Sequence, residues 1–210
     1  MATVVIFGAS RGVGLEVVKR ALDAGHRVRA VARAAEEIPI DKRKLWKINA
    51  SALNAGDVDR AVSGAHAVIT CLGVPPTLKP VTLFSESTRC VIEAMAAHGV
   101  KRLIAVTGIG AGDSRGIGGA LYTQVFQPIF LRTIYDDKDR EEDIIRKTRL
   151  EWTIVRPGFL TRLPATGKYR TLTEPDQWEG GFIPRGDVAD FLVKQIDDRA
   201  YLRQTPLLIA

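Results

Sequence analysis

The sequence predicts an α/β fold built on a doubly wound, mainly parallel sheet, and three observations support this fold class. Short apolar runs alternate with stretches of helical periodicity along most of the chain. The segments between them are short. A glycine-rich turn separates the first apolar run from the first helical stretch. We therefore expect a single domain over residues 1–210, in which residues 159–185 form a small lobe.

The first element is a strand that begins at Thr3, and the turn after it contains three glycines. Gly8, Gly12 and Gly14 are spaced G-x-x-x-G-x-G. Gly8 permits a tight turn, Gly12 lets the backbone approach a pyrophosphate, and Gly14 lets the following helix pack on the strand. The N–H groups at the helix N-terminus would face the phosphates. The pattern predicts a dinucleotide site, and its alternative is a βα turn that binds no nucleotide.

The next elements alternate between helix and strand. The first helix is expected to end at Gly25, because glycine often stops a helix. The second strand alternates apolar and basic side chains. Strands are predicted over residues 26–33, 45–48, 67–72 and 101–107, and helices over 54–62 and 81–98. Ligands of such sheets bind at the carboxyl ends of the strands, so we expect the site there.

The second half of the chain begins with a glycine-rich segment, residues 108–119. It is expected to form either a loose surface loop or a lid over a ligand. Asp187 is expected to be the N-cap of the last long helix. The remaining predictions are a long helix over residues 130–149 and strands over 152–156, 168–172 and 206–210.

Composition and charge narrow the class of protein. The net charge is +6, and the basic residues are scattered rather than gathered in one block. An anionic small ligand explains some of this charge as well as a nucleic acid does, so the charge does not require a nucleic-acid partner, and we expect none. Cys71 and Cys90 lack metal-ligand spacing, which predicts no metal site and two buried thiols of a cytoplasmic protein. No apolar run approaches ~18 residues, so neither a membrane span nor a signal peptide is expected.

Two arginines indicate which dinucleotide the turn binds. A cofactor with a free ribose 2′-OH usually meets an acidic residue about 20 residues after the glycines. The second strand ends instead with Arg33, whose guanidinium suits a phosphate. Arg11, inside the turn, lies within reach of the same place. The pair predicts NADP(H), whereas the alternative for each arginine is a solvated surface position.

Five motifs, in this order along the chain, resemble those of the atypical short-chain dehydrogenase/reductase family. The closest resemblance is to its NAD(P)H-binding subgroup around biliverdin reductase B, or flavin reductase. The resemblance covers nearly the whole chain and implies one Rossmann-like domain with NADPH across the strand ends. Residues 159–185 would then lie on the substrate side. The motifs are residues 8–14, Arg33, residues 101–107, residues 152–158 and residues 183–189.

The resemblance also implies which residues surround the cofactor. Residues after the fourth, fifth and sixth strands are expected beside the nicotinamide half. Ser51 stands where the family often has an acidic residue that meets the adenine. The predicted cofactor-binding residues are Gly8, Ser10, Arg11, Gly12, Val13, Gly14, Arg33, Ser51, Leu72, Gly73, Thr107, Pro157, Gly158, Phe159 and Leu160.

The predicted catalytic residues are Thr107, Tyr135 and Lys138, and they depart from the family pattern. Many members use a serine with tyrosine and lysine spaced Y-x-x-x-K, whereas Tyr135 and Lys138 are spaced Y-x-x-K. Residues at i and i+3 still share a helix face. Thr107 precedes Gly108, which occupies the serine position, and would offer a hydroxyl to the substrate or nicotinamide. The alternatives are an exposed polar helix face for the pair and a buried strand end for Thr107.

These features predict an NADPH-dependent reductase whose partner is a small planar or carbonyl-bearing acceptor: a flavin, quinone, tetrapyrrole or ketone. A delocalised acceptor stabilises developing charge itself, which suits a chain without the usual triad. Tyr122, Phe126 and Phe130 would either stack on such an acceptor or pack in the core or a dimer contact. Two alternatives stay open: a non-catalytic NADP-binding redox sensor or regulatory protein, and an epimerase or dehydratase. The protein is expected to be a monomer or a homodimer.

Overall fold

The computed structural model describes residues 1–117 and 131–210 of the chain. Its strands are β1 (Thr3–Phe7), β2 (Arg27–Ala32), β3 (Leu45–Asn49), β4 (Ala67–Thr70), β5 (Arg102–Val106), β6 (Glu151–Pro157), β7 (Phe159–Thr161), β8 (Arg170–Leu172), β9 (Phe182–Pro184) and β10 (Leu207–Ile209). Its α-helices are α1 (Gly12–Asp23), α2 (Ala55–Val62), α3 (Leu83–Ala97), α4 (Arg132–Arg146) and α5 (Arg185–Lys194). Short 3₁₀ turns cover Ala35–Glu37, Gly112–Ser114 and Pro175–Gln177.

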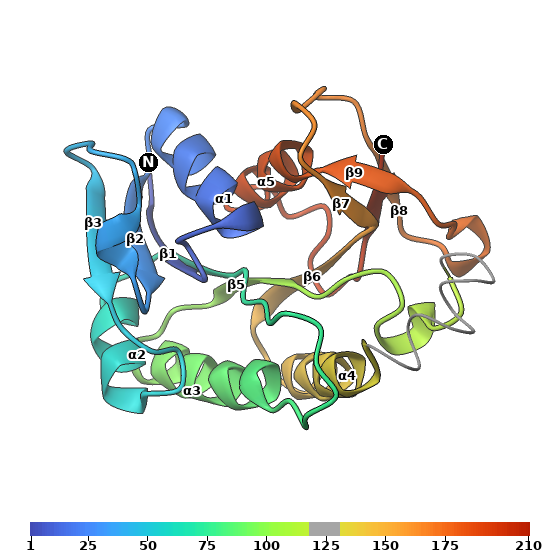
Figure 1. Ribbon diagram of the computed structural model, residues 1–210. Helices are drawn as coiled ribbons and strands as arrows, with labels where there is room; N and C mark the ends of the chain where they lie inside the picture. The colour runs from blue at the N-terminus through green and yellow to red at the C-terminus, as the bar shows by residue number, and fades with distance from the viewer. Residues whose placement is uncertain (118–130) are drawn as a thin grey trace.

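Eight of these strands form one sheet in the order β3-β2-β1-β4-β5-β6-β10-β8. Neighbours from β3 to β10 pair in parallel, and β8 pairs antiparallel with β10 at one edge. Helices α1 and α5 cover one face of the sheet, and α2, α3 and α4 cover the other (Figure 1). This topology confirms the predicted Rossmann-like α/β class.

The central strands are apolar at nearly every position because helices cover both faces of the sheet. In β1, Val4 and Ile6 pack on the α1 and α5 side, whereas Val5 and Phe7 pack on the α2 and α3 side. All four side chains are fully buried. The two cores hold the carboxyl ends of the parallel strands along one edge. Within residues 1–117 and 131–210, no helix is both long enough and apolar enough to cross a bilayer.

The start of α5 differs from the prediction. Pro184 occupies the N-cap position and Asp187 lies inside the first turn, so the prediction that Asp187 caps the helix was wrong. Its buried carboxylate instead accepts hydrogen bonds from the backbone N–H groups of Thr166 and Gly167 at 3.0 and 2.8 Å. A side chain two or three residues inside a helix faces sideways, where a neighbouring loop can satisfy it. Asp187 thereby ties the 159–185 segment to the sheet.

Helix α4 is shorter than the predicted span of residues 130–149. It begins at Arg132 and ends at Arg146, and residues before 131 in that span lie outside the described part of the chain. The Thr148 hydroxyl donates to the Ile145 carbonyl oxygen at 2.7 Å. This side-chain bond competes with the next helical bond and ends the helix.

Helix α3 receives its N-terminal cap from α4. The Asp137 carboxylate accepts from the backbone N–H groups of Phe84 and Ser85 at 2.8 and 3.4 Å, and from the Ser85 hydroxyl at 2.5 Å. Thr82, at the N-cap position, forms no capping bond with its own side chain. Asp137 is fully buried, and a carboxylate there also complements the positive end of the helix dipole. The cap couples two helices that lie side by side on the sheet.

Candidate functional site

The predicted cofactor residues lie where the parallel strands end, at one edge of the sheet. Gly8 follows β1, Arg33 follows β2, Leu72 and Gly73 follow β4, and Thr107 follows β5. Pro157 ends β6, and Phe159 begins β7. The strand order reverses its direction between β1 and β4, and ligands of open α/β sheets bind at such a reversal.

The glycine turn between β1 and α1 has the geometry that close backbone packing requires. Gly8 has φ +79°, and a Cβ at this position would lie 2.5 Å from the Cys71 carbonyl oxygen at the end of β4. A Cβ on Gly14 would lie 2.1 Å from the carbonyl oxygen of Gly8. Gly12 has φ +61°, which disfavours other residues, and no atom lies within 4 Å of its ideal Cβ. The turn therefore keeps its backbone accessible at Gly12 while Gly8 and Gly14 pack tightly.

The N-terminus of α1 and two arginines supply positive charge beside this turn. Arg11 occupies the N-cap position, and its side chain makes no capping bond. The Gly8 N–H donates to the Val31 carbonyl oxygen at 3.0 Å, which places the turn against the end of β2, two residues before Arg33. Arg11 and Arg33 are exposed, and neither forms a hydrogen bond or ion pair within the part of the chain that the structure describes. Two unpaired guanidinium groups suit a phosphate.

Ser51 has a local partner in the structure. Its hydroxyl accepts from the Leu53 N–H at 3.2 Å, and its own N–H donates to the Asp57 carboxylate at 3.4 Å. These bonds form the turn that leads into α2, whose first turn is capped by Asn54. The contact between Ser51 and an adenine stays a prediction.

Tyr135 and Lys138 meet at the end of β5. The Lys138 ammonium donates to the Thr107 carbonyl oxygen, and it lies 4.8 Å from the centroid of the Phe84 ring. The Tyr135 hydroxyl lies 3.3 Å from the ideal Cβ position of Gly108. Lys138 is buried and Tyr135 is half-buried. The Y-x-x-K spacing thus brings both side chains to the end of β5, which is part of the predicted site.

The face of α4 that carries Lys138 is buried, so the alternative of an exposed polar helix face was wrong for it. Asp137, Lys138, Glu141 and Glu142 are all buried against α3 and the sheet. The helix has the composition of a surface helix, but the charged groups of Asp137, Lys138 and Glu142 bind backbone groups or side chains of neighbouring elements. Periodicity of charge alone does not distinguish the two cases.

The Thr107 hydroxyl has a partner inside the protein. It donates to the Glu142 carboxylate at 2.8 Å, and Thr107 is 6% exposed. Its hydrogen is therefore committed to Glu142 rather than to an acceptor molecule. This geometry favours the alternative in which Thr107 ends a buried strand, while its carbonyl oxygen positions Lys138.

A buried ion pair under the site was not predicted from the sequence. The Arg156 guanidinium contacts both carboxylate oxygens of Glu142, at 3.0 Å from Nε and 2.5 Å from Nη2. Its Nη1 forms an ion pair with Asp113 at 2.5 Å. Arg156 and Glu142 are 0% and 1% exposed. The one available signal was an arginine that ends an otherwise apolar strand, because such a residue needs a buried counter-ion.

Burial changes the proton affinity of several groups around Lys138. Desolvation lowers the pKa of Lys138, and the nearby carboxylates of Glu141 and Glu142 partly oppose this effect. Desolvation also raises the pKa of Glu141 to about 7 and that of the Cys71 thiol to about 12. Cys71 and Cys90 are half-buried, not fully buried as predicted. The high pKa of Cys71 makes its thiol a poor nucleophile.

Residues 108–114 are packed rather than loose. Ile109, Ala111 and Ser114 are at most 2% exposed. The Ser114 hydroxyl accepts from the Gly110 N–H and donates to the Ala111 carbonyl oxygen, at 3.0 and 2.6 Å. The expectation of a loose surface loop was therefore wrong for this part. Gly118 and Gly119 lie outside the described residues, as do Tyr122, Phe126 and Phe130, and the lid stays a prediction.

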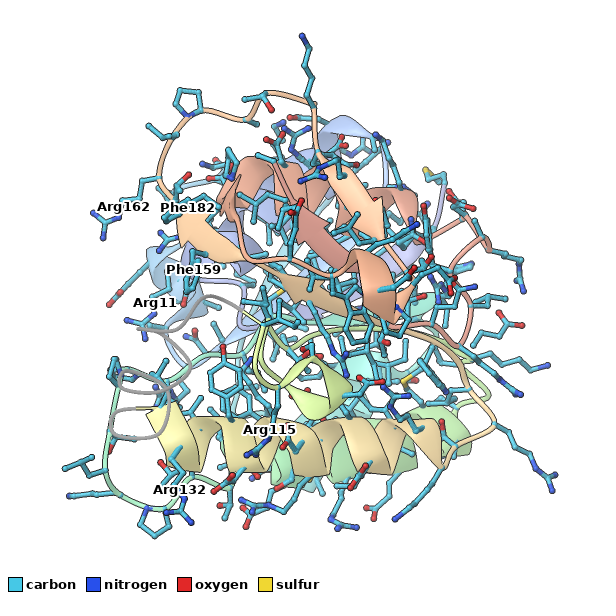
Figure 2. All side chains as sticks on the ribbon, turned by 90° about the vertical axis from the view of Figure 1, so that its right-hand side faces the viewer. Arg11, Arg115, Arg132, Phe159, Arg162 and Phe182 are labelled. Atoms are coloured by element: carbon cyan, nitrogen blue, oxygen red, sulfur yellow. The ribbon has the colours of Figure 1, made fainter. Side chains whose placement is uncertain are left out.

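An aromatic pair projects from the small β7 and β9 sheet. Phe159 and Phe182 have ring centroids 5.6 Å apart, and Phe182 is 67% exposed. Figure 2 shows both rings, with Arg162, on the side of the molecule from which Arg11 projects. Phe182 was not predicted from the sequence because it lies in a short segment after two glycines, with no periodicity. An exposed ring beside a strand-end site offers a stacking surface.

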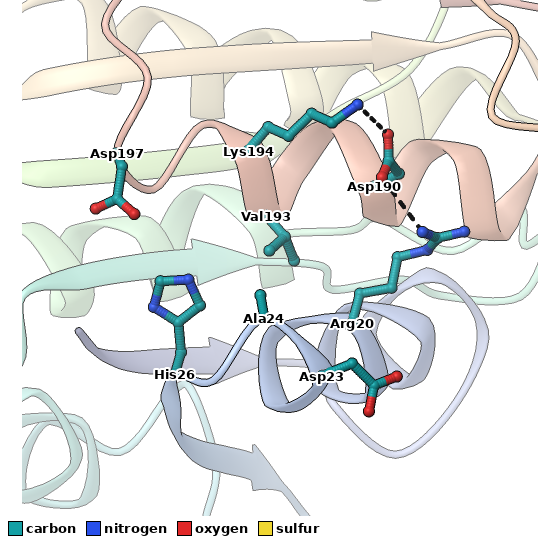
Figure 3. Close-up of a pocket in the computed structure, with 8 residues that line it drawn as sticks. All are labelled: Arg20, Asp23, Ala24, His26, Asp190, Val193, Lys194 and Asp197. Carbon is teal, nitrogen blue, oxygen red and sulfur yellow. Dashed lines mark hydrogen bonds and ion pairs between the residues drawn. The ribbon is translucent and has the colours of Figure 1, made fainter. Parts of the chain in front are cut away.

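A depression of about 520 Å³ lies between α1 and α5, away from the strand ends (Figure 3). Its lining includes His26, just before β2, and Asp197, shortly after α5. Asp190, also in the lining, bridges Arg20 and Lys194 at 3.2 and 2.7 Å. The charge of Asp190 is thus paired within the protein, and the position of the depression does not match that of a dinucleotide in such a sheet.

Comparisons with known proteins indicate the family of the chain. The family model described as NAD(P)H-binding matches residues 8–199. The chain is 28% identical over 206 residues to a Bacillus subtilis (strain 168) protein named an uncharacterized sugar epimerase, YhfK. The match covers 93% of this chain and 88% of that protein.

Two solved structures are similar over nearly the full length. One is ChuY, named an anaerobillin reductase, from Escherichia coli O157:H7, with 26% identity and a TM-score of 0.77. The match covers 96% of the ChuY chain and 99% of this chain. The other is a short-chain dehydrogenase/reductase from Veillonella parvula in complex with NADP, with 18% identity and a TM-score of 0.84. The match covers 94% of the Veillonella chain and 100% of this chain. The second likeness supports the fold alone.

Proposed function

Because the chain belongs to the NAD(P)H-binding family, we propose that it is a reductase that transfers hydride from NADPH to a small planar or carbonyl-bearing acceptor. One observation carries this proposal: Tyr135 and Lys138 converge at Thr107 and Gly108, at the edge where the glycine turn also lies. The similarity to a protein named as a reductase, at 26% identity over nearly the whole chain, supports it.

The residues present fit a phosphorylated dinucleotide. The turn leaves its backbone open at Gly12, and the N-terminus of α1 offers N–H groups to the pyrophosphate. Arg11 and Arg33 lie beside it, and neither has an ion-pair partner among residues 1–117 and 131–210. When bound, the cofactor supplies the hydride. The acceptor is a flavin, quinone, tetrapyrrole or ketone in this proposal, and Phe159 and Phe182 supply its stacking surface.

The protein's contribution to catalysis is to orient the two molecules and to balance charge. The Tyr135 hydroxyl and the Lys138 ammonium stand at the end of β5, where a developing negative charge on the acceptor would be stabilised. Thr107 holds the ammonium through its carbonyl oxygen and is itself held by Glu142. A delocalised acceptor needs no stronger acid than this.

Replacing Arg33 with aspartate should weaken NADPH binding by about 100-fold, because it removes a phosphate ligand and adds a like charge. NADH binding should change by less than about threefold, since NADH has no 2′-phosphate. Dissociation constants from fluorescence titration measure both. Arg43→Asp, an exposed arginine before β3, is the matched control. Equal losses for the two cofactors would contradict the assignment of Arg33.

Replacing Lys138 with alanine should lower kcat by about 100-fold while NADPH affinity stays within about threefold. The ammonium acts at the reacting end of the site, whereas affinity comes from the turn and the arginines. Lys147→Ala, an exposed lysine just after α4, controls for loss of positive charge. Unchanged turnover of the Lys138→Ala variant would contradict a catalytic role and show that Lys138 is only structural.

The function itself is tested by mixing the protein with NADPH and a panel of flavins, quinones, tetrapyrroles and ketones, and following absorbance of the reduced nicotinamide. Turnover of an acceptor supports the reductase. Tight binding without turnover across the panel supports the redox sensor. The name of the Bacillus relative favours an epimerase as a second candidate. An epimerase would interconvert sugar stereoisomers without net consumption of NADPH, which product analysis by chromatography detects.

A further inference from the structure

Glu141 is a buried carboxylate that the mechanism above does not use. It lies on α4 and is 3% exposed. Its Oε1 accepts a hydrogen bond from the Thr88 hydroxyl of α3 at 3.3 Å. Its Oε2 is buried and has no hydrogen-bond partner, and no cation lies within 4.0 Å of the carboxylate in residues 1–117 and 131–210. A buried charge with so few contacts is costly, so its presence calls for a partner at somewhat longer range.

Lys138 is the cation that can fill this role. Residues at i and i+3 share a helix face, so Lys138 and Glu141 both point into the space between α3, α4 and the sheet. The ammonium contacts the carbonyl oxygen of Thr107, just after β5, and the Phe84 ring of α3, neither of which carries a net charge. A buried ammonium with neutral partners tends to lose its proton unless a negative charge lies near.

The other charged and titratable groups around Lys138 have partners of their own. Asp137 caps α3 and pairs with Arg140 at 3.1 Å. Glu142 is held by Arg156 of β6 and by the hydroxyl of Thr107, just after β5. The Cys71 thiol, just after β4, lies near the ammonium, and burial raises the pKa of this thiol, so it stays neutral. Glu141 is therefore the carboxylate whose charge is left for Lys138.

We propose that Glu141 is a positioning residue that keeps Lys138 protonated at the end of β5, an inference that rests on the proposed reductase function. The arrangement is a charge pair in which neither group touches the other, with Thr88 holding the carboxylate and Thr107 holding the ammonium. Glu141 acts through Lys138 and does not contact the acceptor. Its removal would leave an ammonium with reduced tendency to hold its proton at basic pH, where Glu141 carries its full charge.

The direct test measures the pKa of Lys138 in the cofactor-free protein. Lysine labelled with ¹³C at the ε-carbon gives one NMR signal per side chain, and the Lys138 signal is assigned by its loss in Lys138→Arg. In Glu141→Gln the pKa of Lys138 should fall by about one unit or more, because an opposite charge nearby raises a lysine pKa by that order. Asp143→Asn removes an exposed carboxylate from the same helix and should leave it unchanged.

Two further variants keep the result interpretable if Glu141→Gln folds poorly. Glu141→Asp retains the charge and should keep the pKa of Lys138 near that of the wild type. Thr88→Val removes the hydrogen bond to the carboxylate with little change in volume, so Glu141 becomes a weaker acid and the pKa of Lys138 falls by a smaller amount. Circular dichroism and thermal unfolding establish that each variant is folded.

The kinetic arm connects this pair to catalysis. With an acceptor that the wild type reduces, the fall of kcat at basic pH should move to lower pH by about one unit in Glu141→Gln and stay in place in Asp143→Asn. An unchanged pKa of Lys138 overturns the proposal, and so does a shifted pKa with an unchanged pH profile. Absence of turnover by the wild type with every acceptor overturns the proposed function, and the NMR result then stands as the separate measure of the charge pair.

Discussion

Replacing Glu142 with alanine should lower the free energy of unfolding by about 3–5 kcal/mol. Glu142 is 1% exposed, and its carboxylate is the counter-ion of the fully buried Arg156. Removing it leaves a guanidinium in the core whose Nε and Nη2 lose their acceptors. The Thr107 hydroxyl loses its acceptor at the same time. Urea unfolding at pH 7, followed by circular dichroism, measures the change.

Two further variants separate the buried pair from a general loss of charge. Asp143→Ala removes the neighbouring exposed carboxylate of α4 and should cost less than about 1 kcal/mol. The double variant Glu142→Leu with Arg156→Met replaces both charges by apolar side chains and should recover most of the loss, because a buried pair often stabilises no more than a packed apolar pair. A Glu142→Ala variant as stable as Asp143→Ala would contradict the assignment.

Replacing Gly14 with alanine should reduce NADPH affinity by about 100-fold and destabilise the fold by about 1–3 kcal/mol or more. The new Cβ would lie 2.1 Å from the Gly8 carbonyl oxygen and 2.9 Å from its carbonyl carbon. Both are backbone atoms, so no side-chain rotation relieves the overlap, and α1 must move away from the turn. The N–H groups of α1 then no longer face the pyrophosphate.

The control for this substitution lies on the same edge of the sheet. Gly73 follows β4, has no atom within 4 Å of its ideal Cβ and does not have a positive φ. Gly73→Ala should therefore keep the stability of the wild type. Thermal unfolding of both variants gives the comparison of stability, and titration of the Gly14→Ala variant and the wild type with NADPH gives the change in affinity. Wild-type affinity in a folded Gly14→Ala variant would show that the turn does not hold the cofactor.

The sequence allowed the fold to be predicted, because the fold depends on local patterns, and the location of the cofactor site stays a prediction. Gly8 and Gly14 are required by contacts within the strand, turn and helix that contain them. The Y-x-x-K spacing of Tyr135 and Lys138 also follows from helix geometry, and the structure places both at Gly108 and Thr107. The charge pattern of α4 does not show that this face of the helix is buried.

The missed features are contacts between residues far apart in the chain. Glu142 and Arg156 look like surface charges until α4 and β6 pack together, and Asp187 looks like a cap until the segment at Thr166 folds over it. Phe182 acquires a partner only when β9 pairs with β7. Tertiary packing determines which groups bind a buried charge, and these partners cannot be read from a single sequence.

The cap that α4 provides for α3 has a consequence for synthesis on the ribosome. Asp137 is translated more than fifty residues after Phe84, whose N–H it accepts. While α3 emerges, the N–H groups of its first turn lack this acceptor, and the Val81 carbonyl oxygen just before the helix lacks its Arg140 donor. The amino end of α3 therefore frays on a nascent chain and becomes ordered only after α4 has left the exit tunnel. On a ribosome stalled before residue 137, the nascent chain contains β1 to β5 and α3 but not Asp137. The backbone amides in the first turn of α3 should then exchange rapidly with solvent.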